Sequence, residues 1–159
     1  MKTGIYAIGR IKRGPEAELV DRYLDRAKKA GPALGLTGFE LAEFDESRAK
    51  SAAERKRDEG EKLLDRAGNA VLVVLDETGK NLKSVDFANW LAAQRDQGTA
   101  SIAYLLGGPD GHDQTVVRKS NLLLSLGKMT LPHLLARVVL AEQLYRAVTI
   151  FGNHPYHRA

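Results

Sequence analysis

The sequence of 159 residues contains no cysteine. Disulfide bonds, thiolate metal ligands and cysteine nucleophiles are therefore excluded from its fold and chemistry. Histidine is sparse too, although two of the four, His154 and His157, come close together near the C-terminus. Pro155 between them is incompatible with the helical spacing of a metal-binding pair, and no third ligand is evident. We therefore expect no metal site.

Long hydrophobic runs are also absent. The longest are residues 70–75 and 102–106, far short of the roughly 20 apolar residues that a membrane-spanning helix needs. The first six residues lack the apolar stretch and cleavage site of a signal peptide. Hydrophobic residues make up 43% and charged residues 28%, as in ordinary globular proteins. We expect a cytoplasmic protein with no membrane association, folded as one domain.

Acidic residues are scarce in the C-terminal segment. From Gln114 onward the chain has six Lys or Arg residues and a single acid, Glu142, whereas the preceding 113 residues hold 18 basic and 19 acidic groups. The net charge of +4 is thus concentrated near the C-terminus. A polyanionic partner such as RNA would explain that placement. A solvated basic face that keeps the protein soluble would explain it equally well, so the charge alone does not decide between them.

Apolar residues occur in short blocks separated by stretches of helical periodicity. Residues 70–75 are apolar throughout and β-branched, which is typical of a strand buried on both faces of a parallel sheet. The predicted strands are residues 4–9, 37–44, 70–75, 101–106 and 122–126. The predicted helices are residues 15–30, 47–67 with Ser47 as the cap, 85–97, 114–120 and 132–150. This alternation predicts a single α/β domain with a mostly parallel sheet.

Three of the predicted strands end in distinctive loops, residues 75–80, 107–111 and 126–131. The carboxyl ends of parallel strands meet at one edge of a sheet, where ligands bind, so we expect these loops to form one pocket. The glycines of residues 107–111 let the backbone approach a flat ligand closely, which suits an adenine nucleoside. Each loop taken alone is more typical of a tight turn, and Asp76, Asp110 and Asp113 fit turn-forming acids better than paired catalytic carboxylates.

Neither glycine loop matches a nucleotide-binding motif. Residues 107–111 do not have the spacing G-x-G-x-x-G, and they follow a late strand instead of the first one. Gly127-Lys128-Met129 lacks the upstream glycine of a P-loop, and no Ser or Thr follows the lysine. The sequence therefore supports neither a dinucleotide-binding fold nor an NTPase.

The predicted last helix, residues 132–150, is apolar on more than one side. Beyond His133 its only charged or amide residues are Arg137, Glu142, Gln143 and Arg146. Such a helix is buried on two sides. One side can pack on its own sheet, and the other either on a second subunit or within the core of a monomer.

The chain ends in Asn153-His154-Pro155-Tyr156-His157-Arg158-Ala159. Most C-terminal tails are frayed and have no function. This tail is rich in groups that recognise RNA, because Tyr156 and the histidines can stack on an unpaired base and Arg158 can hold a phosphate.

Five segments occur in the order found in a known family. They are Leu-Asp-Glu-Thr-Gly-Lys (75–80), Gly-Gly-Pro-Asp-Gly (107–111), Leu-Gly-Lys-Met-Thr-Leu-Pro-His (126–133), Glu-Gln-Leu-Tyr-Arg-Ala (142–147) and Asn-His-Pro-Tyr-His-Arg (153–158). In these segments the chain resembles the large-subunit ribosomal RNA pseudouridine-N3 methyltransferases, which belong to the SPOUT class of trefoil-knotted methyltransferases. The similarity runs from about residue 71 to the end, and residues 7–9 and 59–62 also fit. Residues 37–53 contribute little.

The resemblance implies a fold and an activity. The fold is a single α/β domain of the SPOUT type with a C-terminal trefoil knot. The activity is transfer of a methyl group from S-adenosylmethionine to N3 of a pseudouridine in 23S rRNA, on the assembled ribosome, by a homodimer. The methyl donor is expected to bind at the three strand-end loops, through Leu75, Gly107, Leu126, Gly127, Lys128, Met129, Thr130 and Leu131.

For the transfer itself, we hypothesise roles for residues near the C-terminus. Tyr156, His157 and Arg158 are the expected catalytic residues, with His157 as the proton acceptor because imidazole exchanges protons near neutral pH. The residues expected to bind RNA are Arg137, Arg146 and His154. An ion pair of Arg146 with Glu142, one helical turn away, is the purely structural alternative for that arginine.

Two other functions remain open at this stage. The chain could be a non-catalytic ribosome- or RNA-binding α/β protein that retains the pocket, or a nucleotide-binding regulatory module. Binding of S-adenosylmethionine in preference to ATP would exclude the regulatory module. Methylation of ribosomes would exclude the non-catalytic protein.

Overall fold

Five short apolar segments form the strands of one central sheet. The structure is a computed structural model that describes residues 1–157. The strands are β1 (Lys2–Ile8), β2 (Thr37–Phe44), β3 (Val71–Asn81), β4 (Ser101–Leu106) and β5 (Leu122–Ser125). Their order in the sheet is β2-β1-β4-β3-β5, and all four pairings are parallel. The predicted α/β domain with a mostly parallel sheet is confirmed.

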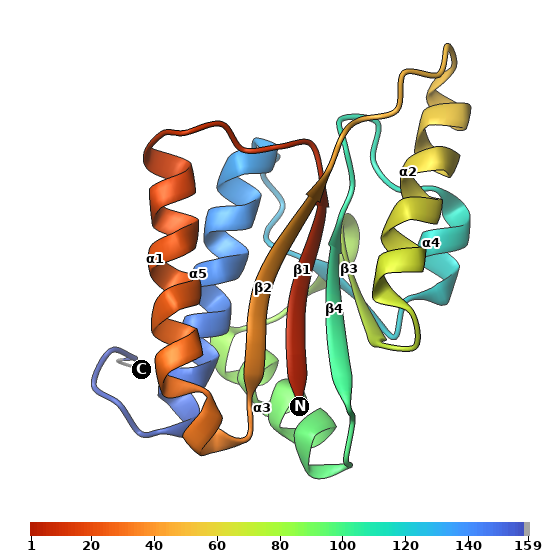
Figure 1. The fold of residues 1–159 in the computed structure, drawn as a ribbon. Coiled ribbons are helices and arrows are strands. Elements are labelled where there is room, and N and C mark those ends of the chain that lie inside the picture. Colours follow the sequence, from red (N-terminus) through yellow and green to blue (C-terminus); the bar gives the residue numbers. More distant parts are fainter. Residues whose placement is uncertain (158–159) are drawn as a thin grey trace.

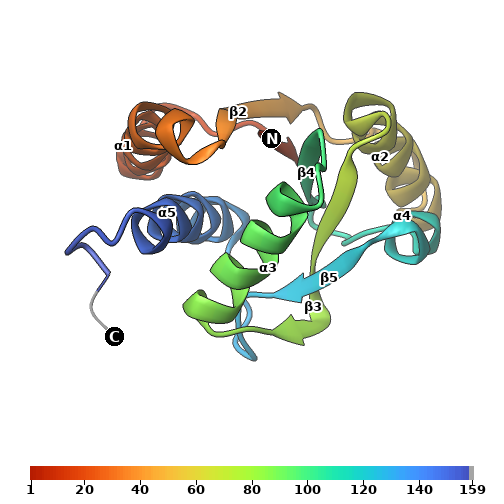
Figure 2. The same cartoon turned by 90° about the horizontal axis from the view of Figure 1, so that it is seen from below.

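Helices cover both faces of this sheet (Figures 1 and 2). One face is covered by α1 (Pro15–Ala30), α3 (Ser84–Asp96) and α5 (His133–Phe151), and the other by α2 (Ala52–Ala67) and α4 (Gln114–Lys119); a short 3-10 turn, η1 (Pro32–Leu34), follows α1. Successive residues of a strand point to opposite faces. In β1, Ile5 therefore packs under α1 and α5, whereas Tyr6 packs on the α2 side. Two hydrophobic cores result, one on each face.

The start of α2 differs from the prediction. Ser51, not Ser47, caps this helix: its hydroxyl accepts the backbone N–H of Glu54 at 3.2 Å, and the Glu54 carboxylate accepts the backbone N–H of Ser51 at 3.5 Å. Ser47 lies in the preceding segment, where its N–H donates to Glu59 at 2.8 Å and its hydroxyl donates to Asp58 at 2.8 Å. The reciprocal pair at Ser51 satisfies backbone donors that would otherwise be left at the helix start.

Strand β3 is longer than predicted. The expected loop at residues 76–80 is instead a bulged part of the strand, because Leu124 of β5 pairs first with Leu75 and again with Lys80. Gly79 makes this close approach feasible: a Cβ atom there would lie 2.7 Å from backbone atoms of Leu123 and Leu124. Asp76 and Glu77 of this bulge line the cavity described below.

Helix α5 runs the length of the domain beside α1 (Figure 1). Its inner side is fully buried at Leu140 and Leu144, as the apolar sequence predicts. Part of its apolar surface is exposed, since Leu135 remains 42% exposed. Within residues 1–157, no helix is both long enough and apolar enough to cross a membrane.

Candidate active site

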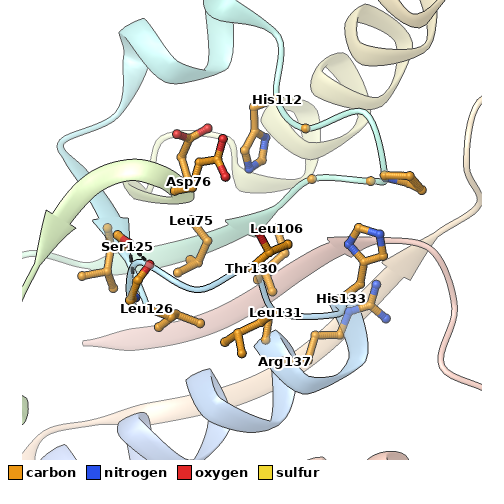
Figure 3. Close-up of a pocket in the computed structure, with 18 of the residues that line it drawn as sticks. Leu75, Asp76, Leu106, His112, Ser125, Leu126, Thr130, Leu131, His133 and Arg137 are labelled. Carbon is orange, nitrogen blue, oxygen red and sulfur yellow. Dashed lines mark hydrogen bonds between the residues drawn. The ribbon is translucent and has the colours of Figure 1, made fainter.

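A cavity of about 410 Å³ opens at the carboxyl edge of the sheet. The bulged part of β3 and the segments that follow β4 and β5 line it, together with the first two turns of α5 (Figure 3). The predicted convergence of the three strand-end loops is therefore confirmed. The predicted donor-binding residues that line the cavity are Leu75, Gly107, Leu126, Gly127, Met129, Thr130 and Leu131. Lys128 is exposed and does not line it.

The loop after β4 is a compact turn. The N–H of Gly111 donates to the carbonyl of Gly108 at 3.0 Å, and Gly111 has a φ of +82°, a conformation that favours glycine. A Cβ atom on Gly107 would lie 3.0 Å from the carbonyl carbon of Gly111, so the backbone is closely packed there. Arg55 of α2 clamps the loop through two hydrogen bonds to Asp110, at 2.7 and 3.1 Å. The Arg55 guanidinium keeps the pKa of Asp110 below its ordinary value.

The loop after β5 is held from within by Ser125. Its hydroxyl donates to the carbonyl of Gly127 at 2.9 Å and accepts the N–H of the same residue at 3.2 Å. Gly127 has a φ of +142°, which again favours glycine. The next residues project outward, and Met129 is 85% exposed. The loop thus contributes Leu126, Gly127, Thr130 and Leu131 to the cavity lining and leaves Met129 exposed at its rim.

Several polar side chains of the cavity were not predicted as site residues, and His112 and Asp76 are two that lie side by side (Figure 3). His112 follows the glycine loop and is 8% exposed, and its Nε2 atom has no hydrogen-bond partner among residues 1–157. Burial lowers the pKa of His112, although the nearby carboxylate of Asp76 opposes that shift. Asp76 lies in the bulged part of β3 and not in the predicted loop, and its Oδ1 accepts the N–H and the hydroxyl of Thr78 at 2.9 and 2.5 Å. It also lines the cavity beside His112 (Figure 3).

Arg137 lies at the floor of the cavity with 1% of its surface exposed. Its Nη1 donates to Glu43 of β2 at 2.6 Å, and its Nη2 donates to the carbonyl of Ile8 at the end of β1. Burial lowers the pKa of Arg137, whereas Glu43 raises it. An enclosed guanidinium that faces the sheet cannot reach an RNA phosphate outside. The structure therefore places Arg137 as a buried tether between α5 and two strand ends, and not on the predicted RNA-binding surface.

The C-terminal tail folds back on the last turns of α5. The Tyr156 ring lies 4.8 Å from that of Tyr145, and its hydroxyl donates to Glu142 at 3.0 Å. Burial raises the pKa of Tyr156, and hydrogen bonds with Tyr23 and Glu142 raise it further. The phenol therefore stays protonated near neutral pH and cannot serve as a base.

Arg146 organises the rest of this cluster. It forms the ion pair with Glu142, with its Nε at 3.0 Å, and its guanidinium stacks 5.0 Å from the centre of the Tyr156 ring. Its Nη1 lies 3.5 Å from Nδ1 of His157, whose Nε2 is buried with no partner within residues 1–157. His154 is exposed and accepts the N–H of Tyr156 at 3.1 Å. Arg158, a predicted catalytic residue, lies outside the described residues.

The tail and the cavity lie at opposite ends of α5. Arg137 and the cavity are near its N-terminus, and Arg146 is near its C-terminus, from which the tail continues. The helix has 19 residues, so at 1.5 Å per residue it is about 28 Å long. A single chain therefore does not bring its predicted catalytic tail to its predicted donor-binding residues.

Comparison with known proteins identifies the class to which this architecture belongs. Residues 1–157 match the family described as "Predicted SPOUT methyltransferase". The chain is a methyltransferase of the SPOUT family, and membership implies the predicted C-terminal trefoil knot.

Full-length relatives bear a more particular name. A protein of Chelativorans sp. (strain BNC1) named "Ribosomal RNA large subunit methyltransferase H" is 55% identical over 154 residues, which cover 97% of this chain and 89% of that protein. A protein of the same name from Rhizobium etli (strain CIAT 652) is 52% identical over 159 residues, or 99% of each chain. The crystal structure of tRNA (m1G37) methyltransferase from Aquifex aeolicus is similar with a TM-score of 0.56 and 13% identity, covering 100% of this chain and 76% of that one. This last likeness concerns the fold alone.

Proposed function

We propose that this protein methylates N3 of a pseudouridine in 23S rRNA, using S-adenosylmethionine, and that it acts on the assembled ribosome. The observation that carries the proposal is the single cavity formed by three strand-end loops in a SPOUT methyltransferase. The names of the relatives support large-subunit rRNA as the substrate. The basic excess in the segment from Gln114 onward supports a polyanionic partner.

The cavity fits an adenine nucleoside with an attached amino acid. Its volume lies within the range of small-molecule sites, and backbone and aliphatic groups line most of it. The residues proposed to hold the donor are Leu75, Gly107 and the loop from Leu126 to Leu131. When bound there, S-adenosylmethionine supplies a methyl group on a positively charged sulfur. The clamps at Asp110 and Ser125 keep the surrounding loops in place, which favours alignment of the reacting atoms.

We propose further that the protein acts as a homodimer in which the tail of one chain meets the cavity of the other. The length of α5 separates the two within a chain, so a second copy is the direct way to unite them. Exposed apolar side chains at Leu135 and Met129 lie beside the cavity end of α5 and support an apolar interface there.

The tail residues are proposed to handle the RNA base. Its N3 carries a proton that must leave as the methyl group arrives, so a proton acceptor accelerates the reaction. His157 is the proposed acceptor, through Nε2, the atom that lacks a partner. The protonated Tyr156 is proposed to stack or donate a hydrogen bond, while Arg146 and Arg158 stabilise negative charge on the base or its phosphate.

Ribosomes from cells that lack the modification provide the test. Incubation with the protein and methyl-labelled S-adenosylmethionine should label large-subunit rRNA at a pseudouridine. A chain that lacks residues 156–159 should lose methylation and still bind S-adenosylmethionine in calorimetry. Methylation that survives the deletion would remove the tail from the mechanism, and a full chain that binds the donor without labelling rRNA would indicate a non-catalytic protein.

A further inference from the structure

His112 is a buried polar residue of the cavity that the proposed methyl transfer does not use. It is 8% exposed, and its Nε2 has no partner among the described residues. Its Cε1 would lie 3.3 Å from a Cβ atom on Gly107, so the ring packs directly against the glycine loop. Buried polar atoms are nearly always hydrogen-bonded, so an unpaired nitrogen beside a cavity is completed by a water molecule or by an atom of a bound ligand.

Among the described residues, Asp76 in the bulged part of β3 is the acid that raises the pKa of His112 by charge, and backbone hydrogen bonds with Leu105 and Leu75 also raise that pKa. Both hydrogen bonds between Asp76 and Thr78 use Oδ1, which leaves Oδ2 available to a ligand. The other charged groups around the cavity are engaged or more distant: Asp110 pairs with Arg55, Arg137 pairs with Glu43, and Glu77 and His133 are exposed at the rim. Beneath the loop, buried Glu59 lies against Gly108.

The two side chains have complementary hydrogen-bonding capacities. Ionised Asp76 only accepts, whereas a neutral imidazole offers one donor and one acceptor. Burial lowers the pKa of His112, so the neutral form prevails near neutral pH. Hydroxyl groups both donate and accept, so two neighbouring hydroxyls can satisfy this pair together. The rest of the lining is largely backbone and leucine side chains, such as Leu106 and Leu131, which suit a flat base.

We propose that Asp76 and His112 recognise the ribose hydroxyls of the nucleoside bound in this cavity, with His112 contacting one of them through Nε2. The pair makes the cavity selective for ribonucleosides over deoxyribonucleosides. This inference rests on the proposed function, because it assumes that the cavity binds an adenine nucleoside.

Calorimetry with stable nucleosides tests the proposal without any turnover. The probes are S-adenosylhomocysteine, 5′-methylthioadenosine and the 2′-deoxy and 3′-deoxy forms of the latter. The wild-type protein should bind 5′-methylthioadenosine about tenfold more tightly than at least one of its deoxy forms, as expected for loss of one or two hydrogen bonds. H112L should bind the ribonucleoside about tenfold more weakly and lose the discrimination, with unchanged affinity for that deoxy form.

Matched variants distinguish a direct contact of His112 with the ligand from a purely structural role of this residue. H112Q can place an amide near the Nε2 position and should keep part of the discrimination, whereas H112N is too short and should lose it. R118M changes an exposed residue of α4 that does not line the cavity and should bind every probe as the wild type does. Thermal melting of each variant establishes that it is folded.

The outcomes distinguish this inference from the proposed function. A wild-type protein that binds neither S-adenosylhomocysteine nor S-adenosylmethionine would overturn the proposed function itself. If the wild type binds the probes but H112L lowers the affinity for the ribonucleoside and for its deoxy forms equally, His112 supports the loop or contacts the base. The proposal is then overturned. Equal affinity of H112L and the wild type for all probes would overturn it as well.

Discussion

At the scale of single residues, Arg137 holds together the elements that form the cavity floor. It joins the start of α5 to the ends of β1 and β2 by one ion pair and one hydrogen bond to a carbonyl. Glu43 also accepts the backbone N–H of Ile11 at 3.0 Å, so the same carboxylate orders the segment after β1. The cavity floor thus depends on one enclosed charge pair, and removal of either partner leaves the other uncompensated.

We expect Arg137→Met to lower the free energy of unfolding by about 2–4 kcal/mol. This is less than the loss for fully buried pairs, because Glu43 retains some exposure. Urea denaturation measures the change, and Arg118→Met on the exposed face of α4 should be close to neutral. The double variant Arg137→Met with Glu43→Met should recover part of the loss, whereas additive losses would indicate that the two side chains are not coupled.

The protonation of His112 should make stability depend on pH. Because its pKa is lowered in the folded protein, the unfolded chain binds a proton more readily as the pH falls. The stabilisation is complete above the ordinary histidine pKa and is lost as the pH falls toward the lowered value. Between about pH 7 and pH 5, the wild type should therefore lose stability more steeply than H112L. Parallel curves of unfolding free energy against pH would show that His112 is not the responsible group.

Among the secondary-structure elements, α2 depends on its cap. Ser51→Ala removes the hydroxyl that accepts the N–H of Glu54 and should cost about 1 kcal/mol of stability. Ser51→Asp retains an acceptor at the same position and should stay within a few tenths of a kcal/mol of the wild type. Thermal melting of the two variants gives the comparison, and equal melting temperatures would contradict the assignment of Ser51 as the cap.

The bulge in β3 depends on Gly79. Gly79→Ala would place a methyl group 2.7 Å from the backbone of β5, so we expect a loss of about 1–3 kcal/mol and weaker donor binding as the strands separate. Gly152→Ala is the matched control, since its Cβ would meet only ordinary contacts at 3.6 Å. Denaturant unfolding and calorimetry test both variants, and a Gly79→Ala protein as stable as the wild type would exclude the close approach.

The sequence predicted elements best where their signals are local. Helix α1 begins at Pro15 and ends before Gly31-Pro32, as predicted, because proline and glycine restrict the backbone regardless of the surroundings. The predicted start of α2 was wrong because two serines, Ser47 and Ser51, precede the helix. Only Ser51 has a glutamate three residues later, which completes the capping box. The extension of β3 was missed because it requires pairing with β5, a partner brought together by the whole fold.

The candidate site was also predictable only where its signals are local. Glycine loops after buried strands indicated the cavity, since parallel strands end at one edge. His112 was missed because its buried, unpaired Nε2 is a product of tertiary packing. The enclosure of Arg137 has the same origin, because Glu43 lies 94 residues away in sequence. The tail and the cavity are separated because α5 runs away from the cavity for its whole length. Sequence motifs do not reveal the direction in which a helix runs.

For the whole molecule, the proposed union of the tail and the cavity in a dimer can be tested by complementation. One chain carries Gly107→Val to fill the cavity, and the other lacks residues 156–159. Each alone should be inactive. An equal mixture forms mixed dimers in about half of its assemblies, each with one intact site, so about one quarter of wild-type activity should return. A mixture as inactive as its parts would show that both halves of the site must come from one chain.

The position of β1 between β2 and β4 in the sheet has a consequence for how the protein is made. In β1, Lys2 pairs with Thr37 of β2 on one side and with Ser101 of β4 on the other. The edge of β1 that faces β4 therefore stays uncovered until β4 has been synthesised. At synthesis rates of about 5–20 residues per second, the segment between the end of β2 and the start of β4, residues 45–100, takes roughly 3–11 s to make. Throughout that interval the nascent chain carries an open parallel edge beside aliphatic side chains, a template for pairing with neighbouring chains. The speed of translation across residues 45–100 therefore sets how long the growing chain is open to aggregation.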